Sequence, residues 1–73
     1  MISFMNQYTA AIQQDGDHWI GWIEEVPGVN SQGNSREELL ENLRSALCEA
    51  VEMNRKEAQQ AAGDHFEEIQ ITA

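Results

Sequence analysis

Apolar residues recur at three- and four-residue spacing along residues 35–53, and this spacing predicts a strongly amphipathic helix. Ser35 stands where an N-cap is expected. The carboxylate of Glu38, three residues later, can accept a hydrogen bond from the Ser35 amide and complete a capping box. We expect the helix to begin at Arg36 and to end within residues 54–63, where the apolar stripe thins out. The stripe consists of Leu39, Leu40, Leu43, Ala46, Leu47, Ala50 and Val51.

Alternation with a period of two predicts strands on both sides of this helix. The Asp15-Gly16 pair predicts a tight turn between the first two strands, and Pro27-Gly28 ends the second. The resulting order, β-β-β-α-β, predicts an α+β fold in which one helix packs on one face of an antiparallel sheet. The expected strands are Phe4 to Gln14, His18 to Val26, Val29 to Gln32 and Phe66 to Thr72.

Two tryptophans in the second strand point to a contact surface. Trp19 and Trp22 are three residues apart, so in a regular strand they lie on opposite faces of the sheet. We expect one indole under the helix and the other on the uncovered face, where an exposed tryptophan is typical of a binding surface. With Glu24 and Glu25 at the end of the strand, these are the predicted partner-binding residues. The alternative is that the indoles only fill the core and the acids only face solvent.

The length and charge of the chain narrow the classes of function. A chain of 73 residues forms a single domain, residues 1–73, and a domain of this size gains stability by forming a homo-oligomer. It has 13 acidic side chains against 4 basic ones, a net charge of −9, so we expect no direct binding to nucleic acid. Such a charge favours a basic protein partner, although acidity that serves solubility alone is the alternative.

Three segments contain an ordered set of motifs: YTAAI (residues 8–12), DGDHWIGWIEEVPGV (residues 15–29) and SQGNSREELLENLRSAL (residues 31–47). The order is an aromatic second strand, a Pro-Gly pair, a Ser-x-Gly turn and a Ser-capped helix that begins with Glu-Glu. This ordered set resembles the HicB-like antitoxins of prokaryotic toxin–antitoxin systems. One departure is Val29, where the family often has cysteine.

The resemblance implies a partial ribonuclease-H-like fold and a role in neutralising a small basic HicA-type ribonuclease by covering its RNA-binding and catalytic surface. Many family members carry a DNA-binding segment after the fourth strand, and we expect none here. An alternative is a stand-alone oligomeric interaction domain with a different partner, for example an orphan or phage-borne copy.

We expect the chain to be neither an enzyme nor a carrier of a metal or cofactor. Two Asp/His groups could offer metal ligands, which would suit a metal-dependent hydrolase, but we favour hairpin-turn and helix-end chemistry as their explanation. The predicted first strand has no acidic residue for nuclease chemistry, and Cys48 is the single cysteine. No membrane-spanning run or signal peptide is recognisable, so we expect a prokaryotic cytoplasmic protein. The Asp/His groups are Asp15, Asp17 and His18, and Asp64 and His65.

Overall fold

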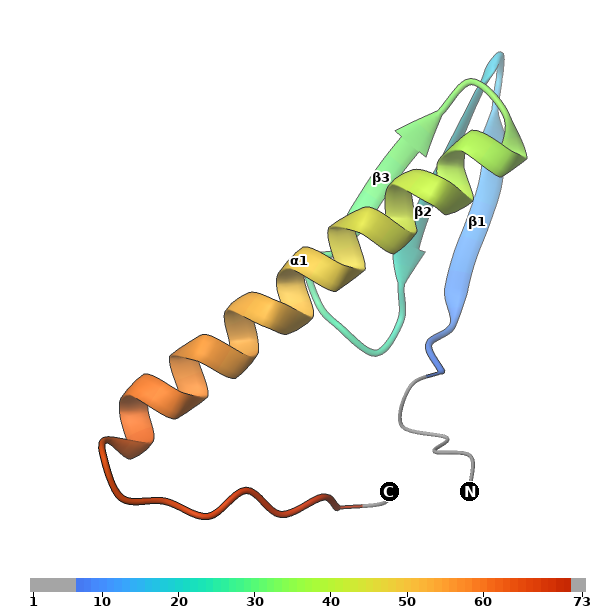
Figure 1. The fold of residues 1–73 in the computed structure, drawn as a ribbon. Coiled ribbons are helices and arrows are strands. Elements are labelled where there is room, and N and C mark those ends of the chain that lie inside the picture. Colours follow the sequence, from blue (N-terminus) through green and yellow to red (C-terminus); the bar gives the residue numbers. More distant parts are fainter. Residues whose placement is uncertain (1–6, 72–73) are drawn as a thin grey trace.

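The computed structural model describes residues 7–71, which form a three-stranded antiparallel sheet with one long helix across one face (Figure 1). The strands lie in the order β1-β2-β3, and the helix follows them in sequence. The predicted α+β arrangement, three antiparallel strands followed by a helix, is confirmed. The elements are β1 (Ala10–Asp15), β2 (His18–Ile23), β3 (Asn30–Gly33) and α1 (Arg36–Ala62).

The hairpin between β1 and β2 has a two-residue loop. Asp15 pairs with His18, so Gly16 and Asp17 form the loop, one residue later than the predicted Asp15-Gly16 pair. Gly16 has a φ of 64° and Asp17 does not have a positive φ, which is the pattern of a type II′ turn. Glycine is needed at this position because other residues rarely adopt a left-handed backbone conformation.

Strand β2 is shorter than predicted at the Pro-Gly break, and β3 is shifted one residue later, to Asn30–Gly33. Strand β2 ends at Ile23 rather than Val26, and β3 begins after Val29. Turns occupy the residues between, where the Ile23 amide donates a 3.0 Å hydrogen bond to the Val29 carbonyl. The Val29 amide in turn donates to the Val26 carbonyl at 3.3 Å. Pro27 has no amide hydrogen to donate, so the hydrogen bonding between β2 and β3 ends before the proline.

The start of α1 is capped as predicted, with one difference of partner. The Ser35 hydroxyl accepts a 3.1 Å hydrogen bond from the Glu38 amide. The Glu38 carboxylate returns to the amide of Asn34, at 2.8 Å, rather than to that of Ser35. The amide one residue before the cap therefore takes the place of the expected donor. The helix begins at Arg36, as predicted.

A small core lies between the sheet and the first half of α1. Leu39 and Leu43 are almost completely buried, and both project from the helix toward the sheet. Because Gly21 and Gly33 have no side chain, the backbones of β2 and β3 can lie close to the helix. A Cβ at Gly21 would contact the Leu43 side chain, and one at Gly33 would contact the Leu39 backbone. The core residues are Ile23, Val29, Leu39 and Leu43, with Ala10, Ile12, Trp19, Val26, Ala46, Leu47 and Ala50 packed around them.

The second half of α1 extends well beyond the sheet (Figure 1). The helix remains regular to Ala62, at the far limit of the predicted range, and Gly63 caps it with a φ of 84°. The Gly63 amide donates a 3.1 Å hydrogen bond to the Gln59 carbonyl. With 27 residues and a rise of about 1.5 Å each, α1 is about 40 Å long. It therefore carries the C-terminal segment away from the core.

The prediction of a fourth strand is wrong for the residues that the structure describes. Residues 66–71 belong to no strand, because α1 carries them past the sheet and no strand lies beside them to pair with their backbone. The predicted first strand also begins later, at Ala10 instead of Phe4. Residues 4–6 and Thr72 of these two predictions lie outside the described part of the chain.

Candidate functional site

The face of the sheet opposite α1 carries an exposed tryptophan. Trp22 projects from this face, and 44 % of its surface is exposed. Ile20, two residues earlier in β2, lies on the same face and is half-buried. We call this surface the open sheet face. The register places four exposed side chains around these two residues, namely Ala11 and Gln13 from β1 and Asn30 and Gln32 from β3.

The two tryptophans lie on opposite faces, as their spacing predicts. Trp19 is half-buried and packs against the core on the helix side. Trp22 lies on the middle strand of the open sheet face, near the end of β2, and is paired across the sheet with Ala11 and Asn30. The two indoles therefore have different roles. Trp19 contributes to the packing of the helix on the sheet, whereas Trp22 is the large apolar side chain that the open sheet face exposes.

The two acidic residues after β2 are tied to the beginning of β1. The Glu24 amide donates a 2.9 Å hydrogen bond to the Thr9 carbonyl, and the Glu25 carboxylate accepts one of 2.8 Å from the Thr9 amide. The hydrogen bond from Thr9 lowers the pKa of the Glu25 carboxyl below its usual value. Both residues are exposed. The Glu24 carboxylate thus faces solvent near the sheet, while that of Glu25 holds the chain that leads into β1.

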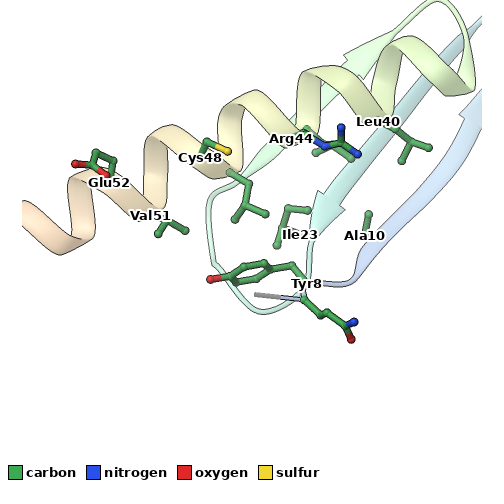
Figure 2. A pocket seen from close by; sticks show the side chains of 11 residues that line it. Tyr8, Ala10, Ile23, Leu40, Arg44, Cys48, Val51 and Glu52 are labelled. Carbon is green, nitrogen blue, oxygen red and sulfur yellow. The ribbon is translucent and has the colours of Figure 1, made fainter. Parts of the chain in front are cut away.

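A second apolar surface lies between the outer edge of β1 and the helix (Figure 2). Figure 2 shows Tyr8 and Ala10 from the β1 side opposite Leu40 and Val51 from α1, with Arg44 at the rim. We call this surface the β1 groove. Its further lining residues are Gln7, Ile23, Leu43, Leu47, Cys48 and Glu52.

The β1 groove was not among the predicted surfaces. The signal was present in the width of the apolar stripe on α1, since only Leu39 and Leu43 of that stripe become fully buried. Leu40, Leu47 and Val51 remain half-buried, because three strands are too narrow a sheet to cover them. Tyr8, 38 % exposed, lines the opposite wall of the groove.

The two Asp/His groups do not come together. Asp15, Asp17 and His18 lie at the tip of the β1–β2 hairpin, near the start of α1, whereas Asp64 and His65 follow the other end of the helix. These ends lie far apart in Figure 1. Within residues 7–71, no three His, Cys, Asp or Glu side chains are grouped so that they could hold a metal ion.

The helix does not have the character of a membrane span. Within the described residues, no helix combines the length and the apolar composition needed to cross a bilayer. The helix α1 is long enough, but acidic, basic and amide side chains alternate with its apolar stripe.

Comparison with known proteins finds a distant relative of nearly the same extent. The chain is 29 % identical over 68 residues to the UPF0150 protein Ta0767 of Thermoplasma acidophilum, and the alignment covers 92 % of this chain and 99 % of that protein. No protein-family model matches the sequence, and no solved structure matches it. The name of this relative states no activity, ligand or partner.

Proposed function

We propose that this protein is an antitoxin-like binding module that neutralises a small basic HicA-type ribonuclease by covering its RNA-binding and catalytic surface. The observation that carries the proposal is Trp22, which lies exposed on the middle strand of a sheet face that no described element covers. Tryptophan supplies a large contact area at a small cost in conformational entropy, so it is enriched among the residues that dominate protein interfaces.

The electrostatics of the chain favour a basic partner. The net charge of −9 spreads a negative potential over a small surface, and such a potential speeds encounter with a positively charged protein. Glu24 places a carboxylate beside the sheet, close to the strand that carries Trp22. A ribonuclease presents basic groups where it binds RNA, so an acidic surface can compete with RNA for the same site. This mechanism is occlusion and requires no chemistry from the acidic protein.

The resemblance to HicB-like antitoxins supports the choice of partner. The segments that carry it, residues 8–12, 15–29 and 31–47, build the hairpin, the Pro-Gly turn, β3 and the capped start of α1. These elements form one continuous unit that supports the open sheet face on one side and the core on the other. The resemblance therefore covers the part of the chain that presents Trp22.

The proposal is tested with a purified HicA-type ribonuclease from the same host. We expect RNA cleavage to stop when this protein reaches a molar ratio of about one to one, and we expect binding to weaken as salt rises. Trp22→Ala should weaken binding by about 30-fold or more, the effect of removing a central interface residue. Met53→Ala, which removes an apolar side chain that is 60 % exposed on α1, is the matched control and should bind like the wild type.

Two results would contradict the proposal in different ways. If cleavage continues in the presence of a large excess of the folded protein, the antitoxin role is wrong. The alternative of an interaction domain with a different partner would then be favoured. If the protein binds the ribonuclease but Trp22→Ala binds equally well, the open sheet face is not the contact surface.

A further inference from the structure

We propose that the β1 groove binds the C-terminal segment Phe66–Ile71 of a second copy of this chain. Two copies would exchange these segments, and each sheet would gain a fourth strand along the outer edge of β1. The occupant is thus a named segment of the same protein, supplied by its partner. The inference concerns self-association alone and does not depend on the toxin proposed above.

The outer edge of β1 is free to accept a strand. Within residues 7–71, β1 forms a ladder only with β2, so the backbone groups along its other side pair with no described strand. An open edge of this kind readily accepts a further strand. The neighbouring wall of α1 contributes Leu40, Leu47 and Val51, which would pack against the apolar side chains of that strand (Figure 2).

The C-terminal segment has the pattern that this edge requires. In an extended conformation, Glu67, Ile69 and Ile71 share one face, because side chains alternate with a period of two. The two isoleucines are 73 % and 78 % exposed in the structure. This face, a carboxylate followed by two apolar side chains, can pair Glu67 with the guanidinium of Arg44 and place the isoleucines against the apolar side chains of the groove, whose lining also includes the carboxylate of Glu52.

The segment is held only loosely in its present position. A hydrogen bond of 3.0 Å joins the Gln59 amide group to the Glu68 carboxylate, and this contact is exposed to solvent. Such a bond contributes little net stability because water competes for both partners. Moving the segment into a groove would replace this contact with backbone hydrogen bonds and with the burial of Ile69 and Ile71.

The geometry of α1 favours exchange between copies over folding back within one copy. Arg44 and Gly63 are 19 residues apart, which is about 28 Å along a helix. Ile71 lies eight positions after Gly63, a separation that spans about 26–29 Å when the chain is fully extended. Ile71 of the same copy would only just reach the level of Arg44, and Ile69 would fall short. A second copy can place the whole segment along β1 without shortening either helix.

Cysteine cross-linking between two different versions of the full chain tests the exchange directly. The wild type supplies Cys48, which is exposed in the β1 groove. The other version carries Cys48→Ser together with Gln70→Cys, so its only thiol lies in the C-terminal segment. The two are mixed at about 150 mM salt, which screens repulsion between the acidic copies, and treated with a short bismaleimide.

We expect a cross-link that joins Cys48 of the wild type to the new thiol at position 70, identified by mass spectrometry of the joined peptides. The control version carries Cys48→Ser with Gln60→Cys, which places the thiol on the exposed far part of α1, and should give no such product. If the position-70 version cross-links to the wild type no better than this control, the exchange is refuted.

Sedimentation equilibrium provides a second, independent measurement. We expect a wild-type dimer whose dissociation constant rises by about 100-fold or more in the double variant Ile69→Asp, Ile71→Asp, because both isoleucines lose their apolar contacts. A control with Gln60→Glu and Ala61→Glu adds the same charge at exposed helix positions and should remain dimeric. Far-ultraviolet circular dichroism checks that the helix is retained. A monomeric wild type at all concentrations, or a dimer unaffected by the isoleucine changes, would overturn the proposal.

Discussion

Replacing Gly33 with alanine tests whether α1 packs directly on β3. Gly33 is buried at the end of β3, and a Cβ built there would lie 2.7 Å from the backbone nitrogen of Leu39 and 3.1 Å from its Cα. These are backbone atoms of the first turns of α1, so no side-chain rotation can relieve the clash. The backbone of Gly33 does not have a positive φ, and alanine would therefore be free of conformational strain there. Any loss of stability comes from the contact with the helix.

The magnitude follows from the cost of overpacking. Forcing an extra methyl group into a packed interior typically costs about 1–3 kcal/mol, and a rigid neighbour places Gly33→Ala at the upper end of that range. A domain of this size has a free energy of unfolding of only about 3–5 kcal/mol. With an m-value of about 1 kcal/mol/M in urea, the midpoint of unfolding should fall by about 2–3 M.

Gly16→Ala is the matched control for this prediction. Gly16 has a positive φ, but a Cβ built there meets nothing within 4 Å. Its cost is therefore the backbone strain of an alanine at a positive φ, about 1–2 kcal/mol. Urea unfolding followed by circular dichroism and tryptophan fluorescence gives both values, and Trp19, which pairs with Gly33, reports on the site. If Gly33→Ala costs no more than Gly16→Ala, the close packing of α1 on β3 is wrong.

Two further predictions concern single hydrogen bonds. Ser35→Ala removes the hydroxyl that accepts a hydrogen bond from the Glu38 amide, and it should lower the free energy of unfolding, measured by urea titration, by about 1 kcal/mol. Ser35→Asp keeps an oxygen acceptor at the cap and should retain most of the wild-type stability. A cost near zero would show that the cap is unimportant in solution. The hydrogen bond from Thr9 lowers the pKa of Glu25 in the folded state below its unfolded value of about 4.5. The contribution of this hydrogen bond to stability is therefore complete above the unfolded pKa and is lost as pH falls through the folded pKa. Glu25→Gln should flatten this acidic dependence of stability, Glu24→Gln should not, and equal profiles for the two variants would contradict the assigned hydrogen bond.

Local patterns in the sequence were sufficient for the elements that depend on neighbouring residues. The Ser35 cap, the helix start at Arg36 and the β1–β2 hairpin each rest on residues a few positions apart, and each appears in the structure. The opposite placement of Trp19 and Trp22 also follows from strand geometry alone. Strand ends were less predictable. Strand β2 ends at Ile23, whose amide donates to the Val29 carbonyl and so closes the turn that follows.

The β1 groove and the fate of the C-terminal segment depend on the whole fold. The sequence shows which helix residues are apolar, but not that a three-stranded sheet leaves Leu40, Leu47 and Val51 half-buried. The pattern of residues 66–71 favours a strand, yet a strand forms only where another strand lies within hydrogen-bonding distance.

The capped helix, the hairpin and the separation of the two indoles could be predicted because each depends on residues that are near one another in the chain, and the fold class followed from the order of the predicted elements. Three features depend on how these elements pack: how far α1 extends beyond the sheet, which part of its apolar stripe stays uncovered, and the absence of a strand within residues 66–71. All three are set by distances between parts of the chain that a local pattern does not contain. A helix about 40 Å long moves the C-terminal segment away from the edge of β1, where the backbone and side-chain contacts that would stabilise a fourth strand are found.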